Sequence, residues 1–218
     1  MSSRKVTKAG IAAAALAIAD AEGLAAVSMR RIAQELGVGT MSLYHYVNSK
    51  AEIISAIDDA LMGEVLVPTV PEKWRDALTA IALRTRDVFV GHPWALSSMQ
   101  SAPPGVNAML HMEQCLEALA KANMTTEEKL TLLALVDDFV FGYALRETTD
   151  HPVVDIDATK KRLATGPFPE LRKAFGKQRR LSIAYRFDLG LEAIFDKFSE
   201  RGLMRTARPR RQRRNSAK

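Results

Sequence analysis

Apolar side chains recur along most of the chain at intervals of three and four residues, the spacing that places them on one face of an α-helix. Alternating runs separated by turn dipeptides, which would indicate strands, are not found in the sequence. The pattern therefore predicts an all-α protein. We expect helices over 8–22, 28–37, 40–46, 49–66, 72–91, 94–99, 105–122, 126–148, 168–175 and 179–201, and a loop over 150–168.

Some of these helices begin and end at residues that favour those positions. Ser49 with Glu52, and Thr125 with Glu128, have the spacing of a capping box, in which a hydroxyl and a carboxylate satisfy free backbone amides. Gly37 follows the helix over 28–37 as the residue that can adopt a left-handed conformation at a helix end. These signals support the predicted boundaries independently of the apolar pattern.

The segment from Ser28 to Tyr46 has the organisation of a helix-turn-helix. Two short helices flank the tight turn Gly37–Gly39, an arrangement in which the second helix projects into the major groove of DNA. The apolar positions that can close a small core against the first helix of the chain are Ile32, Ala33, Leu36, Val38, Leu43 and Val47. The side chains left for base edges are Thr40, Met41, Ser42, Tyr44 and His45, with Tyr46 as a further candidate.

Basic side chains beside this segment are candidates for phosphate contacts. Lys50 stands in the first turn of the helix over 49–66, where its ammonium and the free amides of the helix end can face one phosphate. Either Arg30 or Arg31 can contact the DNA backbone from the preceding helix. The alternative for each residue is an ordinary solvated charge, and we favour DNA contact because the whole set lies in register around one helix-turn-helix.

The helical pattern is interrupted at Pro68 and Pro71, which divide the chain near 67–71. The expected parts are a DNA-binding unit over 1–66, a larger helical ligand-binding and dimerisation unit over 72–204, and a disordered basic tail over 205–218.

The formal net charge of +6 is concentrated at the two ends of the chain. Residues 1–50 hold six lysines and arginines against three carboxylates, and residues 201–218 hold eight against none. This asymmetry indicates a polyanion that the N-terminal segment meets, either nucleic acid or an anionic membrane. The tail has two readings, a solvated segment that aids solubility or a non-specific phosphate-binding arm.

The remaining composition narrows the class of protein. A single cysteine, Cys115, excludes an intrachain disulfide and a cysteine-based metal cluster, and fits a reducing cytoplasm. The alanine run over 9–19 imitates a secretory signal, but it is weakly hydrophobic and its removal would delete a helix that the next segment needs. No run reaches the roughly 18 uncharged apolar residues of a membrane span, and the nearest, 130–145, is broken by Asp137 and Asp138.

Catalytic and metal-binding patterns are missing from the sequence. The four histidines have no metal-ligand spacing, and neither a Gly-x-Ser-x-Gly motif nor a phosphate-binding glycine loop occurs. We therefore expect no enzyme, no metal and no cofactor. The rival to a DNA reader is a helical module that binds another protein and no operator.

The run IAQELGVGTMSLYHYVNSK, Ile32–Lys50, resembles the DNA-binding signature of TetR-type repressors, with its Leu-Gly-Val turn, Leu-Tyr pair and following lysine. The resemblance implies a repressor that binds a palindromic operator as a homodimer and is released when a small effector binds its C-terminal part. The DNA contacts that it implies are Arg30, Thr40, Met41, Ser42, Tyr44, His45 and Lys50.

A weaker resemblance to the tetracycline repressor's own subgroup runs from Trp74 to the helix that ends near Thr149. In that subgroup two histidines help to hold a drug–magnesium chelate, and Gly63 and Met99 stand in their places here, which argues against such a ligand. The resemblance implies instead a small hydrophobic effector in a cavity lined by Ile81, Thr85, Phe89, Met99, Pro103, Met109, Met112, Leu135, Phe139 and Tyr143. Polar contacts to it would come from Thr85, His92, Trp94 or Tyr143.

Without the family, Met and Phe residues at helical spacing are more typical of plain core than of a ligand site. The last helix raises a similar question. Its apolar stripe can face the chain's own core or an exposed seam, and the stripe consists of Ile183, Phe187, Leu191, Ile194 and Phe198. We expect the helices over 126–148 and 179–201 to form a four-helix bundle across a two-fold axis, as the resemblance implies.

Overall fold

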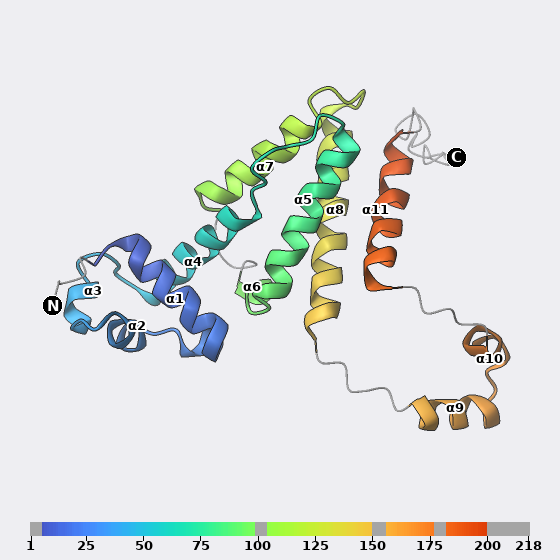
Figure 1. Cartoon of the computed structure of the whole chain (residues 1–218), viewed down its shortest axis with the longest axis horizontal. Coiled ribbons are helices and arrows are strands. Elements are labelled where there is room, and N and C mark those ends of the chain that lie inside the picture. Colours follow the sequence, from blue (N-terminus) through green and yellow to red (C-terminus); the bar gives the residue numbers. More distant parts are fainter. Residues whose placement is uncertain (1–5, 99–103, 150–155, 177–181, 200–218) are drawn as a thin grey trace, which may run out of the picture.

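The computed structural model describes residues 6–98, 104–149, 156–176 and 182–199, and every regular element in these ranges is helical (Figure 1). This confirms the all-α prediction. The elements are α1 (Lys8–Glu22), the short 3₁₀ helix η1 (Leu24–Ala26), α2 (Met29–Leu36), α3 (Thr40–Leu43), α4 (Lys50–Val65), α5 (Trp74–Gly91), α6 (Ala95–Ser98), α7 (Val106–Ala118), α8 (Thr126–Thr148), α9 (Ile156–Thr165), α10 (Pro169–Gly176) and α11 (Ile183–Ser199). Within the described ranges, no helix is both long and apolar enough to cross a membrane.

Helices α1 to α4 pack around one apolar cluster, which we call the N-terminal core. The buried face of α1 contributes Ile11, Ala15 and Ile18, the positions that its sequence pattern predicts. Ile53 and Ile57 from the first half of α4 complete the cluster. This core fixes how α2 and α3 are presented to the outside.

Helix α4 connects this unit to the rest of the chain (Figure 1). Its second half leaves the N-terminal core, and Leu61 and Val65 are buried with Phe89 of α5 and Ala144 of α8 in a second cluster, the junction core. One continuous helix therefore belongs to two cores. A movement between the two parts of the molecule must act on α4 or on the contacts beside it.

The larger part of the molecule is organised around α8, which packs against both α5 and α11. Its main core joins Leu78 of α5, Cys115 of α7, Val136 of α8 and Phe187 of α11. Four of the five residues of the stripe predicted on the last helix face this interior, because Phe187 and Leu191 are buried there and Ile194 and Phe198 are partly buried. The fifth, Ile183, remains outside and is about half exposed, as are Tyr185 and Leu189 of the same helix.

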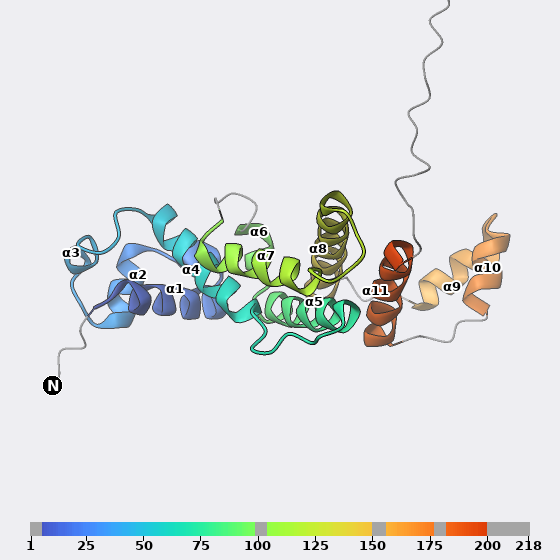
Figure 2. The same cartoon turned by 90° about the horizontal axis from the view of Figure 1, so that it is seen from above.

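The loop expected over 150–168 is wrong in part, because α9 occupies Ile156–Thr165. Arg172 of α10 explains how this charged segment is held as a helix, since its guanidinium donates to Leu163 O at 3.0 Å and to Gly166 O at 2.9 Å. A local sequence pattern does not reveal such a contact. Figure 1 shows α9 and α10 apart from the other helices, and Figure 2 shows them at the opposite end of the molecule from α1 to α3.

Candidate nucleic-acid interface and regulatory cavity

The turn between α2 and α3 is built by backbone hydrogen bonds. Gly37 adopts the left-handed conformation, with φ 67° and ψ 32°. Its N–H donates to Gln34 O at 3.2 Å, and the N–H of Val38 donates to Ala33 O at 3.0 Å, the bond pair of a Schellman motif. A side chain at position 37 would be strained by the positive φ, so glycine sets the angle at which α3 leaves α2.

The outer surface of α3 is apolar at its tip and polar around it. Met41 is 76% exposed and Tyr44 is 47% exposed, with His45 exposed beside them. The structure places Tyr44 to Tyr46 in a turn after Leu43 rather than in the longer helix predicted over 40–46. Three of the candidate base-reading residues are half-buried, namely Thr40, Ser42 and Tyr46, the last of which packs against the N-terminal core.

The two arginines of α2 differ in their partners. Arg31 donates to Glu22 and to Glu35, each at 2.7 Å, and these carboxylates raise the pKa of its guanidinium. Arg30 is exposed and makes no ion pair within the described residues. Of the two phosphate-contact candidates, Arg30 is thus the one whose charge is not already neutralised.

Lys50 is the first residue of α4 and is exposed. The preceding Ser49 accepts from Glu52 N at 3.1 Å, which is one half of the predicted capping box. The other half is displaced by one residue, because the Glu52 carboxylate accepts from Asn48 N at 2.8 Å. This bond, together with the ammonium of Lys8 at 3.2 Å, lowers the pKa of Glu52. The network braces the helix end from which Lys50 projects.

The residues proposed to line an effector cavity fall into three groups. Ile81, Thr85 and Phe89 are buried in the interior of α5. Phe139 and Tyr143 pack with Phe187, at ring-centroid distances of 5.3 and 5.0 Å. Exposed in the single chain are Met109, Met112 and Leu135, while Met99 and Pro103 lie outside the described residues. That these residues line one effector cavity therefore stays a prediction.

The four side chains expected to offer polar contacts are all engaged within the chain. Thr85 Oγ1 donates to Ile81 O of its own helix, and the Tyr143 hydroxyl donates to Ile183 O. Both His92 and Trp94 bond to Asp20. Trp94 could donate to an effector only by leaving Asp20, whereas the Thr85 and Tyr143 hydroxyls could still accept a hydrogen bond while keeping their present partners.

A cavity of about 650 Å³ lies between α6 and α8 and opens to the surface. Apolar side chains make most of its wall, with a hydroxyl and one carboxylate among them, and the lining residues are Pro93, Leu96, Ser97, Asp138, Phe141, Gly142 and Leu145. None of the sequence-predicted lining residues is in this set. The sequence did hold one indication of this cavity, because Asp138 is a charged residue in an otherwise apolar helix. From the sequence alone, that residue served only to exclude a membrane span.

Gly63 marks a close approach of α4 and α7. A Cβ atom at this position would lie 3.1 Å from Nδ2 of Asn107. Asn107 is held there by Asp59, which accepts from its backbone N–H at 2.8 Å and from its side-chain amide through the backbone oxygen at 2.9 Å. Any side chain at position 63, a histidine included, would therefore require Asn107 to shift slightly away from α4.

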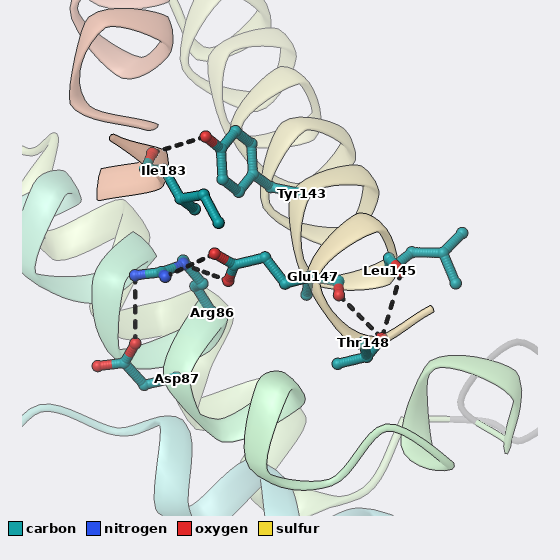
Figure 3. A network of polar contacts seen from close by, with 8 residues as sticks. Arg86, Asp87, Tyr143, Leu145, Glu147, Thr148 and Ile183 are labelled. Atoms are coloured by element: carbon teal, nitrogen blue, oxygen red, sulfur yellow. Dashed lines mark hydrogen bonds and ion pairs between the residues drawn. The ribbon is translucent and has the colours of Figure 1, made fainter. Parts of the chain in front are cut away.

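An ion-pair network joins α5, α8 and the start of α11 (Figure 3). Arg86 donates to both carboxylate oxygens of Glu147, at 2.8 and 2.9 Å, and stacks over the Phe187 ring at 5.3 Å. Glu147 is the first cause of the raised pKa of Arg86. Tyr143 binds Ile183 alongside, so the end of α8 and the start of α11 are held together.

Comparison with known proteins matches two family models to consecutive parts of the chain. Residues 11–57 match the model of bacterial regulatory proteins of the tetR family, and residues 67–200 match the tetracycline repressor-like C-terminal domain. Together the two matches include most of α1, all of α2 and α3, the first half of α4, and α5 to α11.

Individual relatives agree with these matches. The HTH-type transcriptional repressor DrrR1 of Streptomyces coeruleorubidus is 41% identical over 134 residues, 60% of this chain and 50% of DrrR1, so the match spans about half of that relative. The class E tetracycline repressor of Escherichia coli is 27% identical over 85% of this chain and 87% of its own length. Apo ActR of Streptomyces coelicolor superposes with a TM-score of 0.77 at 32% identity, over 91% of this chain and 96% of ActR. The chain belongs to the tetR family of bacterial regulatory proteins.

Proposed function

We propose that the chain is a homodimeric transcriptional repressor of the cytoplasm that binds operator DNA through α3 and is released by a small effector. The exposed surface of α3 and of the turn after it, where Met41, Tyr44 and His45 are held outward by the buried Leu43, carries this proposal. These side chains suit base edges and thymine methyls. The rival hypothesis, a module that binds only another protein, does not explain why such side chains are exposed on the second helix of a helix-turn-helix.

Arg30 and Lys50 would position the reader on the DNA backbone, and Thr40 and Ser42 would add hydrogen bonds at the base of α3. Arg30 and Lys50 project from the first turns of α2 and α4, the helices before and after α3, and form no ion pair among the described residues. Phosphate contacts of this kind fix register and orientation, and base contacts supply sequence preference.

Dimerisation would use the exposed apolar side chains of α8 and α11. Tyr185 and Leu189 on α11 and Leu145 on α8 are each about half exposed in the single chain. A two-fold seam over them would present two α3 surfaces to two half-sites of one operator. Leu189→Arg should halve the mass measured by light scattering while helicity persists, and Met109→Arg, on an exposed position of α7, should leave the mass unchanged.

The cavity between α6 and α8 is our candidate for the effector site. ActR has been solved with actinorhodin bound, which supports a small organic ligand in this fold at 31% identity. The wall formed by Leu96, Phe141 and Leu145 favours an apolar ligand, and Asp138 favours one with a hydrogen-bond donor or a positive charge directed at its carboxylate. Actinorhodin is a reasonable first probe.

The proposed DNA-binding surface is tested by measuring affinity for duplexes that the chain selects from random-sequence DNA. Lys50→Ala should weaken all bound sequences about equally and reduce the slope of log affinity against log salt by roughly 0.9 per phosphate, hence about 1.8 for a dimer. Lys121→Ala, which removes an exposed lysine of the segment after α7, is the matched control and should leave the slope unchanged. If Lys50→Ala has the same slope of log affinity against log salt as the parent chain, Lys50 does not contact a phosphate.

A further inference from the structure

We infer that Asp20, His92 and Trp94 form the joint through which the cavity between α6 and α8 controls the position of the DNA-reading part. We call these three residues the latch. The inference rests on the proposed function, since it concerns how that cavity and that reader communicate. Nothing in the family signature or in the predicted site residues points to Asp20.

Both polar contacts of the latch involve the same carboxylate oxygen, Oδ1 of Asp20. Asp20 Oδ1 on α1 accepts from Trp94 Nε1 at 2.8 Å and lies 2.6 Å from His92 Nδ1. The imidazole and the indole also meet edge to face, with ring centroids 6.3 Å apart. On its other side, His92 Nε2 lies 4.0 Å from a carboxylate oxygen of Glu64 on α4. The segment after α5 is therefore bonded to α1 and lies close to α4.

Apolar contacts reinforce the same joint. Trp94 packs against both the N-terminal core and the junction core, and Leu16 of α1 is the other side chain that belongs to both. Leu16 and Asp20 are four residues apart on α1 and therefore share one face of that helix. His92 is only 16% exposed, so these hydrogen bonds are partly shielded from competing water.

The residues of the latch are continuous with the wall of the cavity. Pro93, Leu96 and Ser97 line that wall, and Trp94 stands between the first two in sequence. Local bonds make the segment move as one piece, because Ala95 N donates to His92 O and the Ser97 hydroxyl donates to Trp94 O. Figure 1 shows α6 as a short helix beside the end of α5.

The short helix α6 is held to α4 by a hydrogen bond from Ser98 Oγ to Asp58 Oδ1 at 2.7 Å, and the opposite wall of the cavity is anchored over a much greater length. It belongs to α8, which is packed along its length against α5 and α11. A ligand that enters between a four-residue helix and a firmly packed one displaces the short helix. The displaced segment then carries His92 and Trp94 away from Asp20, and the ligand favours this open arrangement to the extent that it binds it more tightly.

A cavity-filling substitution can stand in for an unidentified ligand. Gly142 lines the cavity and has no atom within 4 Å of the position where a Cβ would lie, so Gly142→Phe can place a ring in the space. We expect Gly142→Phe to weaken operator affinity by at least about 5-fold, the lower end of typical allosteric coupling. Asp20→Ala, which opens the latch directly, should weaken it similarly.

The decisive result is the double variant. If the cavity-filling ring acts through the latch, Gly142→Phe should change operator affinity less than about 2-fold in the Asp20→Ala background, because the latch is already open there. If the loss of affinity in the double variant equals the product of the losses in the two single variants, the inference is overturned. Glu117→Ala, which removes an exposed carboxylate of α7, is the control and should preserve the full effect of the filler.

A second readout requires no DNA. In a Trp74→Phe background, Trp94 is the remaining tryptophan, since the chain has two. Both Gly142→Phe and Asp20→Ala should shift its emission to the red as the indole loses its partner and gains water. An unchanged spectrum in folded Gly142→Phe protein would overturn the latch. Failure to bind any DNA would instead overturn the proposed function, and the two failures are therefore distinguishable.

Discussion

Gly190 offers a sharp test of how α11 packs on α8. A Cβ atom at Gly190 would lie 2.6 Å from Cε2 of Phe139 and still closer to Cζ, so the ring would have to move. The ring is not free to do so, because it packs against Tyr143 and Phe187 at centroid distances of 5.5 and 5.3 Å. Gly190→Ala should therefore be an overpacking change, even though alanine is the better helix former.

The magnitude follows from two opposing terms. Overpacking costs about 1–3 kcal/mol, and replacing a helical glycine by alanine returns about 1 kcal/mol. The free energy of unfolding should fall by about 1 kcal/mol. Gly91→Ala, at the last residue of α5 with open space around it, should raise stability by up to about 1 kcal/mol.

The assay is urea unfolding followed by circular dichroism, at one protein concentration because the stability of a dimer depends on concentration. Phe139→Leu should cost less in the Gly190→Ala background than in the parent chain, since the smaller side chain relieves the overlap. If Gly190→Ala stabilises the protein as much as Gly91→Ala does, the contact between α8 and α11 is not the one described.

Three further outcomes are expected. Glu147→Gln should lower the free energy of unfolding by about 1–3 kcal/mol in urea titrations. Arg86 would lose the bidentate pair with Glu147 in a largely buried place and would keep, among the described residues, only the longer contact of 3.5 Å to Asp87 as an ion pair. No loss of stability would show that the network of Figure 3 is not formed. Burial, with a smaller contribution from Asp138, raises the pKa of Asp137 from 3.8 to about 6, so the folded protein holds a proton that the unfolded chain releases between these values, and stability should fall as pH rises through that window. Asp137→Asn should flatten this fall and add up to roughly 2–3 kcal/mol at pH 7.5, and an unchanged pH profile would contradict the assignment. Burial raises the pKa of the Cys115 thiol to about 12, so DTNB should fail to label native protein and should label it fully in urea.

Local chemistry could be predicted well from the sequence. The turn after α2 needs only Gly37, and the capping box of α8 forms as its spacing predicts, with Thr125 and Glu128 bonded reciprocally at 3.2 and 2.8 Å. Each of these features depends on residues within one or two turns of one another. Short-range rules of hydrogen bonding and φ preference are sufficient for them.

Side-chain pairing across the chain could not be predicted in the same way. Arg30 and Arg31 are adjacent residues of the same type, so the sequence does not distinguish them. Only the fold shows that Arg31 is paired with Glu22. The latch joins residues 72 and 74 positions apart, and the cavity joins α6 to α8. Such contacts depend on helix packing angles, which a one-dimensional pattern of apolar positions leaves undetermined.

The central claim is that α3 reads a DNA sequence, and in vitro selection from random duplexes tests it most directly. The chain should enrich one palindromic motif whose half-sites lie about one helical turn or more apart. Tyr44→Ala, which alters an exposed side chain of that surface, should abolish or change the motif. Absence of an enriched symmetric motif, or a motif that Tyr44→Ala leaves intact, would contradict the account.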